Sequence, residues 1–193
     1  ILALRDEVLR SSGRIDVLVN NAVARYRPAW NDDAQLFDAS MHVNATGIYM
    51  VTRAIGDVMQ AGGSIINIAS IFGMVGPDPA MYEGIEYRLP SAEYHFHKGG
   101  MIAFTKYVAS YYGARKVRCN CVSPGGLQSL RRSAAYKSEE EWQLSRTRWN
   151  KHTLLGRMAN DTDLKGVVVL LASDASAYIT GTNIPVDGGL TAK

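Results

Sequence analysis

A tyrosine and a lysine four positions apart, Tyr94 and Lys98, are the residues in this sequence that most directly suggest chemistry. Residues at that spacing project from one face of a helix, with Cβ atoms about 5–6 Å apart. A phenol has a pKa of about 10, and a nearby ammonium group favours its ionised form. The pair could therefore exchange a proton at neutral pH. The spacing recurs at Tyr112 and Lys116, where Gly113 predicts a helix end, so spacing alone leaves the function open.

Small polar residues or glycine follow three apolar segments that are typical of buried strands. Asn20, Asn21 and Ala22 follow residues 15–19, Ser70 follows residues 64–69, and Pro124 and Gly125 come soon after residues 117–122. Each group alone is equally typical of turn chemistry. Open parallel sheets, however, bind ligands at the carboxyl ends of their strands. We therefore expect these residues to face one crevice, together with Tyr94 and Lys98.

Helices and strands that could position these residues alternate along the chain. The patterns predict helices over 1–10, over 32–60 with a break near Asn44, over 91–112, from 139 onward and over 161–172, and strands over 15–19, 64–69, 117–122 and 183–186. Residues 71–91 are rich in glycine and proline and predict a loop. Strands alternating with helices of ten or more residues predict an α/β fold with a doubly wound, Rossmann-like parallel sheet.

The composition fits one globular domain and excludes several classes of partner. The chain has 193 residues, 47% hydrophobic and 20% charged, and a formal net charge of +3 spread along the sequence, so no nucleic-acid partner is expected. No apolar run approaches the roughly 20 residues that span a bilayer, and residues 1–10 do not resemble a secretory signal. Cys119 and Cys121 are poorly placed for a disulfide and predict buried thiols. We expect a cytoplasmic protein.

Longer segments strengthen the interpretation of the Tyr94 and Lys98 pair. They are DVLVNNA over 16–22, HVNATG over 42–47, Ser70, YHFHKGG over 94–100, RCNCVSPG over 118–125, and ITG over 179–181 with VDGG over 186–189. Together they resemble the single-domain branch of the short-chain dehydrogenase/reductase family, nearly from end to end. The resemblance implies hydride transfer between NAD or NADP and a small carbonyl or alcohol substrate. The compact ending at 187–189 makes a sugar epimerase or dehydratase of the extended branch a weaker match.

The resemblance also implies a role for each residue. Ser70 would hydrogen-bond the substrate oxygen, and Tyr94 would be the general acid/base. Lys98 would bind the nicotinamide ribose and support Tyr94, and Asn44 would hold a relay water through its main chain. These four are the predicted catalytic residues. The predicted cofactor-binding residues are Asn20, Asn21, Ala22, Ile68, Tyr94, Lys98, Pro124, Gly125, Leu127 and Ser129; no metal site is predicted.

Two local departures from the family pattern concern the cofactor side and the substrate side. Val23 stands where the family has glycine, close to the cofactor. The separation between Ser70 and Tyr94 is longer than usual, and the extra segment 77–87 should hang over the substrate side. Its Tyr-Glu-Gly core resembles inserts in family members from sugar and surface-polysaccharide pathways, which favours a sugar-like substrate. Residues 127–158, with Trp142 and Trp149, are predicted to form a substrate-side lid.

The largest departure concerns the dinucleotide. The 193 residues contain neither the Gly-rich loop that cradles the pyrophosphate nor the residue that separates NAD from NADP. We expect residues 1–193 to be the C-terminal three quarters of one Rossmann-like domain, with N-terminal strands missing and the strand over 15–19 left as an apolar edge. The expected assembly is a homotetramer or homodimer built through helices 32–60 and 92–113. The alternative is a truncated, non-catalytic family member that acts as a binding or structural remnant.

Overall fold

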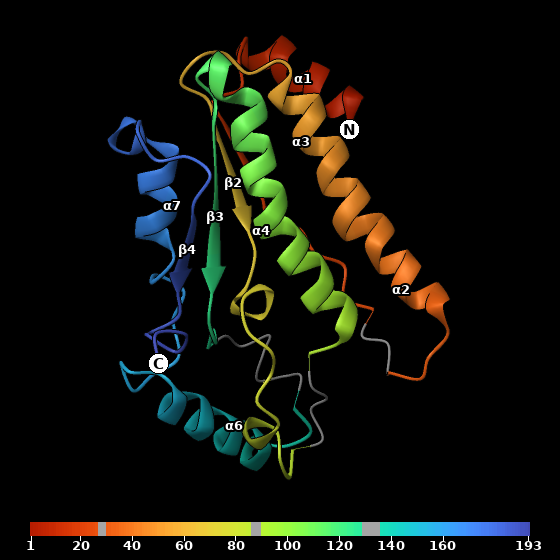
Figure 1. Ribbon diagram of the computed structural model, residues 1–193, viewed down its shortest axis with the longest axis vertical. Helices are drawn as coiled ribbons and strands as arrows, with labels where there is room; N and C mark the ends of the chain where they lie inside the picture. The colour runs from red at the N-terminus through yellow and green to blue at the C-terminus, as the bar shows by residue number, and fades with distance from the viewer. Residues whose placement is uncertain (27–29, 86–89, 129–135) are drawn as a thin grey trace.

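A parallel β-sheet forms the centre of the molecule (Figure 1). The structure, a computed structural model, describes residues 1–26, 30–85, 90–128 and 136–193. Within these ranges the strands are β1 (Val17–Asn20), β2 (Ser64–Ile68), β3 (Arg118–Pro124) and β4 (Asn183–Val186), in the order β1-β2-β3-β4. Every neighbouring pair is parallel, and Ser64 pairs with Val17 on one side and Arg118 on the other. The predicted parallel α/β sheet is confirmed.

Helices cover both faces of the sheet. Their bounds are α1 (Leu2–Ser12), α2 (Ala34–Met41), α3 (Gly47–Gly56), α4 (Ala92–Tyr112), α6 (Glu139–His152) and α7 (Lys165–Ala172). Figure 1 shows α3 and α4 on one side of the strands and α7 on the other. Short helical turns complete the connections: η2 (Ile71–Gly73), η3 (Pro79–Met81), η4 (Gly113–Arg115) and η5 (Asp174–Ser176).

Successive side chains of β2 pack on opposite faces of the sheet, which explains why both faces need covering helices. Ile65 packs with Val108 and Tyr112 in the layer of α3 and α4. The next residue, Ile66, packs with Leu171 on the α7 side. Successive side chains of a strand point to opposite faces, so an unbroken apolar run requires two covering layers. This continuous burial is the feature that made β2 predictable.

The predicted break in the helix over 32–60 is confirmed as a π-helical turn, η1 (His42–Thr46), between α2 and α3. The N–H of Gly47 donates to the carbonyl of His42, five residues back. Asp33 accepts from the N–H of Gln35 and begins α2 at residue 34. Helix α3 ends at Gly56, four residues before the predicted end.

Other boundaries also shift for local reasons. Helix α7 begins at Lys165 rather than 161, because the Asn160 side chain accepts from the N–H groups of Thr162 and Asp163 and forms a turn there. The loop predicted over 71–91 contains the turns η2 and η3. Ser138 accepts from the N–H of Glu141 and begins α6 where the acidic run predicted a helix.

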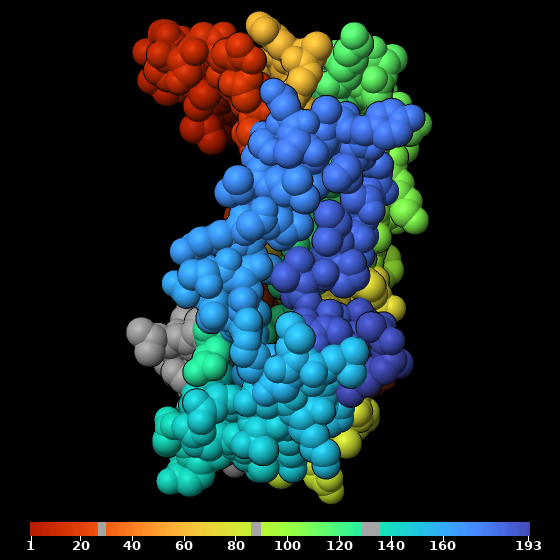
Figure 2. All heavy atoms as spheres, turned by 90° about the vertical axis from the view of Figure 1, so that its left-hand side faces the viewer, coloured from red at the N-terminus to blue at the C-terminus, as the bar shows by residue number. Residues whose placement is uncertain are grey.

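One end of the molecule carries exposed apolar side chains. Helix α1 has no buried residue and projects from the body, as the red atoms in Figure 2 show. On β1, Val17 is 38% and Val19 is 43% exposed, and β2 is the strand's neighbour in the described sheet. The expectation of an apolar edge here is thus met by the exposure of both valines. None of the helices in the described ranges is long and apolar enough to cross a membrane.

Candidate active site

A cavity lies at the carboxyl ends of β2 and β3, on the side where the strand arrows in Figure 1 point. It gathers residues that are far apart in the sequence. Among the predicted site residues, the lining includes Asn21, Ile68, Ser70, Tyr94, Lys98, Pro124, Gly125 and Leu127. The expectation that three strand ends share one crevice is therefore met. Ser129 lies outside the described residues, and Asn20, Ala22 and Asn44 are not part of the lining.

Ser70 directly follows β2 and is 6% exposed. Its Oγ accepts a hydrogen bond from the N–H of Phe72 at 3.2 Å, which begins the turn η2. That turn packs tightly against α4, since a Cβ on Gly73 would lie 2.6 Å from the main-chain oxygen of Lys98. Glycine at position 73 therefore allows the close approach that fixes Ser70 beside α4.

Tyr94 and Lys98 lie in the first two turns of α4. The Lys98 side chain is buried, with the residue 3% exposed, and its Nζ donates to the carbonyl of Ile68 at 2.6 Å. The same Nζ is 5.7 Å from the centroid of the Tyr94 ring. Burial lowers the pKa of Lys98 to about 8, and the nearby Arg25 acts in the same direction while Cys121 opposes it. The ammonium group of Lys98 therefore lies next to the Tyr94 ring, in a buried site that disfavours its charged form.

Arg25 is a cavity residue that sequence reasoning missed. It lies in the segment after β1, and its guanidinium carbon is 5.1 Å from the centroid of the Tyr94 ring. The Tyr94 ring thus has two cations within cation–π distance, Arg25 and Lys98. A single arginine in an irregular segment carries no pattern that a sequence could reveal.

Asn44 holds the segment that carries Arg25. Its amide nitrogen donates to the carbonyl of Ala24 at 2.7 Å and to Ser40 Oγ at 3.0 Å, and its oxygen accepts from the Ala24 N–H at 2.9 Å. Asn44 is 2% exposed, so these bonds form in a protected environment. The side chain therefore clamps the segment after β1, which is a different task from the water relay that the resemblance implies for its main chain.

The side chain of Asn20 lies on the face of the sheet that α3 and α4 cover. Its amide nitrogen donates to Thr52 Oγ1 at 2.9 Å and to Asn67 Oδ1 at 2.8 Å. Asn67 in turn donates to Thr105 Oγ1 at 2.8 Å, so a buried polar network joins β1 and β2 to α3 and α4. A contact between Asn20 and a cofactor would therefore come from its main chain rather than from its side chain.

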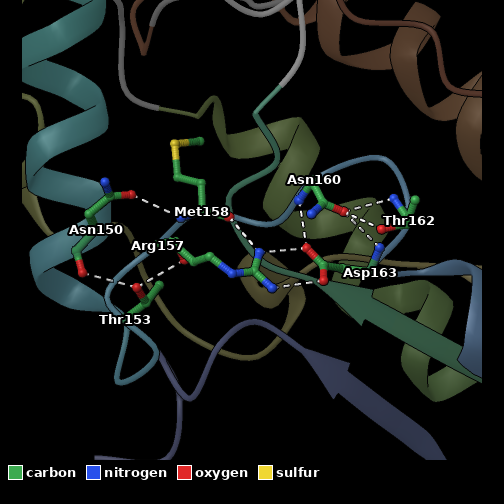
Figure 3. Close-up of polar contacts among 7 residues, drawn as sticks. All are labelled: Asn150, Thr153, Arg157, Met158, Asn160, Thr162 and Asp163. Carbon is green, nitrogen blue, oxygen red and sulfur yellow. Dashed lines mark hydrogen bonds and ion pairs between the residues drawn. The ribbon is translucent and has the colours of Figure 1, made fainter.

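The segment after α6 holds a second group of polar contacts (Figure 3). Asn150 Oδ1 accepts from the N–H of Met158, and Arg157 forms a two-pronged ion pair with Asp163 at 2.7 and 2.9 Å. Asp163 also accepts from the N–H of Asn160. These bonds fold residues 150–163 back on α6, where Trp149 closes one wall of the cavity. Trp149 lines the cavity, and it also packs with Trp142 in one apolar cluster.

The cysteines are free and buried, as predicted. Burial raises the pKa of the Cys119 thiol to about 12 and that of Cys121 to about 11. Neither thiol is activated as a nucleophile, since the thiolate is the reactive form. The described residues also contain no group of three side chains that could hold a metal ion.

His97 lies behind Tyr94 and is 4% exposed. Its ring packs edge-on against Tyr94 at 5.2 Å, and neither ring nitrogen has a hydrogen-bond partner among the described residues. Burial, with the cations of Lys98 and Arg25, lowers the pKa of His97 from 6.5 to about 4. His97 is therefore neutral at physiological pH.

We expect this histidine to make the fold sensitive to acid. The folded pKa of His97 lies below the unfolded one, so its contribution is complete above pH 6.5 and is lost as the pH falls towards 4. The expected loss is at most about 3 kcal/mol, because each unit of pKa difference corresponds to about 1.4 kcal/mol. Urea unfolding of wild type and His97→Gln between pH 7 and 4 measures it. The exposed His42→Gln is the matched control, and an equal acid effect in His97→Gln would contradict the assignment.

The residues of the cavity fit a nicotinamide nucleotide. Lys98 has three N–H donors, and among the described residues one carbonyl accepts from it, which leaves donors for the hydroxyl groups of a ribose. Gly125 lies against the main chain of Asp187, where a Cβ would be 2.8 Å from the nearest atom. Glycine at position 125 therefore allows the end of β3 to pack closely against the segment after β4. Val23 lines the same cavity, so its side chain narrows the opening.

A parallel sheet with helices on both faces and a cavity at the carboxyl ends of its strands, lined by Ser70, Tyr94 and Lys98, defines a protein of the nucleotide-binding α/β class. The sequence agrees: residues 1–191 match the family profile described as enoyl-(acyl carrier protein) reductase. The chain belongs to the short-chain dehydrogenase/reductase family, whose members depend on NAD or NADP.

Individual relatives support this assignment. The 3-oxoacyl-[acyl-carrier-protein] reductase FabG of Thermotoga maritima is 34% identical over 188 residues, which are 96% of this chain and 70% of the relative. D-Threitol dehydrogenase of Mycolicibacterium smegmatis is 32% identical over all of this chain and 69% of its own length. A short-chain dehydrogenase of Leptospira borgpetersenii, solved with bound NAD+, superposes with a TM-score of 0.80 at 29% identity, over 98% of this chain and 70% of its own.

Proposed function

We propose that this protein transfers a hydride between NAD(P) and a small carbonyl or alcohol substrate, with Tyr94 as the general acid/base. One observation carries the proposal: Ser70, Tyr94 and Lys98 line a single cavity at the carboxyl ends of the strands. The nicotinamide supplies or accepts the hydride when it is bound. The residues of this chain orient the substrate and move the proton.

Each of the three residues has a free capacity that matches its proposed task. Ser70 Oγ accepts from Phe72, and within the described structure it donates to no other group, so its proton can point to the substrate oxygen. The Tyr94 hydroxyl exchanges the proton with that oxygen. Lys98, held by the Ile68 carbonyl, stabilises negative charge on the phenol and binds the ribose. The proposed catalytic set also includes Asn44, which fixes the segment after β1.

The remaining parts of the proposal concern binding. We place the cofactor on Asn21, Ile68, Pro124, Gly125 and Leu127, which line the cavity. We also assign cofactor binding to Ser129 and to the main chain of Asn20 and Ala22. We propose residues 127–158 as the lid of this one-domain chain. Tyr82 of the insert lines the cavity, and we propose a sugar-like substrate. The proposed location is the cytoplasm.

Cofactor binding is the first test of this proposal. NADH and NADPH are titrated into the chain as it stands and followed by nucleotide fluorescence and calorimetry. Saturable binding is the expected result, and its preference separates NAD from NADP. Polyols, sugars and simple ketones are then screened for turnover. An absence of binding by both nucleotides would favour the non-catalytic alternative for this chain.

The helical face of α3 and α4 supports the proposal of a homo-oligomer. Tyr107 is 63% and Tyr111 is 62% exposed, and the rings of Phe104, Tyr107 and Tyr111 stack in sequence along α4. Tyr49 of α3 contacts Phe104 at 6.3 Å between ring centroids. Large exposed aromatic patches are typical of protein interfaces. We therefore place the contact with a second copy of this chain on the aromatic face of α3 and α4.

Charge at the centre of this aromatic face should prevent association. Tyr107→Glu is expected to weaken the dimer at least about 10-fold, because it buries an unpaired carboxylate in the interface. Sedimentation velocity across a concentration series measures the change. Tyr178→Glu, which alters a fully exposed tyrosine outside α3 and α4, should leave association intact. A wild-type chain that stays monomeric at all concentrations would contradict the proposed interface.

A further inference from the structure

Arg25 is a charged residue of the cavity that hydride transfer and proton transfer do not use. Its guanidinium carbon is 5.1 Å from the centroid of the Tyr94 ring, and it lines the same cavity as Ser70. Among the residues that the structure describes, no carboxylate forms an ion pair with it. A cation that faces a substrate cavity without an acidic partner is a candidate anion-binding group.

The main chain next to Arg25 is held in place, which distinguishes it from an ordinary surface arginine. The preceding residue, Ala24, is bonded through both its N–H and its carbonyl to the buried Asn44 side chain. The guanidinium group also lies against the face of the Tyr94 ring. The backbone next to Arg25 is therefore ordered before a ligand arrives, which lowers the entropic cost of binding, and the exposed Arg25 side chain lies against the Tyr94 ring.

The charges around the cavity also favour an anion. Lys98 adds a second cation, and both Lys98 and His97 have lowered pKa values to which Arg25 contributes. Glu93 is the acidic residue of the lining, but it is 2% exposed and has a partner of its own. Arg25 and Lys98 therefore place two cations beside the Tyr94 ring in this part of the cavity.

We propose that Arg25 binds an oxyanionic group of the substrate, a carboxylate or a phosphate, so that the enzyme acts on hydroxy acids or phosphorylated alcohols in preference to neutral ones. This inference rests on the proposed function. In the oxidative direction the carbinol C–H bond breaks and its hydride passes to NAD(P)+. The O–H proton passes to Tyr94 as the general base, and a C=O bond forms. The oxyanion keeps its charge throughout, so Arg25 acts in binding and orientation alone.

The proposal predicts a loss that depends on substrate charge. Matched probes are C4–C6 aldonates, the alditols of the same carbon number, and the corresponding sugar phosphates. Arg25→Gln is expected to raise KM for the anionic probes about 10- to 100-fold, the effect of losing hydrogen bonds to a charged group. Arg25→Lys should recover part of that loss, and NADH binding should be unchanged. Arg14→Gln, an exposed arginine that precedes β1, is the matched control.

Two readouts separate this inference from the function on which it rests. Initial rates report turnover, and calorimetric titration of an aldonate or a sugar phosphate reports binding without turnover. Turnover of alditols as readily as anions, or equal losses for both in Arg25→Gln, would overturn the Arg25 assignment and leave the oxidoreductase intact. Anion binding lost in Arg25→Gln, without turnover of any probe, would support Arg25 and overturn the oxidoreductase. No anion binding together with no turnover would overturn both, and weaker NADH binding would assign Arg25 to the cofactor.

Discussion

Tyr94→Phe is expected to lower kcat by a factor of about 10²–10⁴, the usual contribution of a general acid/base. The substitution removes one oxygen from a half-buried ring and leaves the packing of Phe72 and His97 around it unchanged. The substrate oxygen would then have no group with which to exchange its proton. Steady-state rates over a range of pH measure the effect, and NADH titration should give the wild-type dissociation constant.

A matched substitution shows whether the loss is specific to this hydroxyl. Tyr111→Phe removes the hydroxyl of an exposed tyrosine on the same helix and should leave kcat within a factor of two or so. Ser70→Ala should lower kcat without changing the pH dependence, because Ser70 orients the substrate oxygen. Unchanged turnover in Tyr94→Phe would exclude Tyr94 as the acid/base.

Asn67→Leu is expected to lower the free energy of unfolding by about 2–4 kcal/mol, because buried polar atoms lose their partners. Asn67 is fully buried on β2, accepts from Asn20 and donates to Thr105. Without the Asn67 amide, one N–H of Asn20 loses its acceptor and Thr105 Oγ1 loses its donor. Urea denaturation monitored by tryptophan fluorescence gives the change.

A double substitution tests whether the side chains of Asn67 and Thr105 stabilise the fold together. Thr105→Val alone removes the hydroxyl that Asn67 contacts and also the bond from Thr105 Oγ1 to the Met101 carbonyl. If the bond between Asn67 and Thr105 is the stabilising contact, the double variant should be more stable than the sum of the two single effects predicts, by about 1 kcal/mol. Strict additivity would mean that each side chain acts independently.

Much of the architecture could be predicted from local pattern. The run of isoleucines in β2 needs cover on both faces, and glycine after Ser12 ends α1 in a left-handed conformation. The positions of Ser70, Tyr94 and Lys98 followed from strand ends and helical spacing. Each of these inferences uses residues that are close in the sequence, so the chemistry of a short segment was enough.

The contacts that tune the site depend on residues far apart in the chain. Arg25 lies over Tyr94, and Asn44 binds Ala24, 20 positions away. Asn20 shares a hydrogen bond with Asn67, 47 positions away, so a strand-end asparagine that suggested a cofactor contact has its side chain in a structural network. No spacing rule links such pairs, because the sheet register and the helix packing bring them together.

The π-helical turn over residues 42–46 has a consequence for insertions and deletions. Each N–H in such a turn reaches one residue further back than in an α-helix, so the turn accommodates one extra residue. The helices on either side keep their packing, α3 on β1 and α2 on α4. Loss of one residue here would restore an unbroken α-helix and preserve the packing of α2 and α3. It would, however, displace Asn44 from Ala24. At this position the fold and the site therefore change separately. A deletion of one codon would preserve the packing of the helices and would remove the support of the segment that carries Arg25.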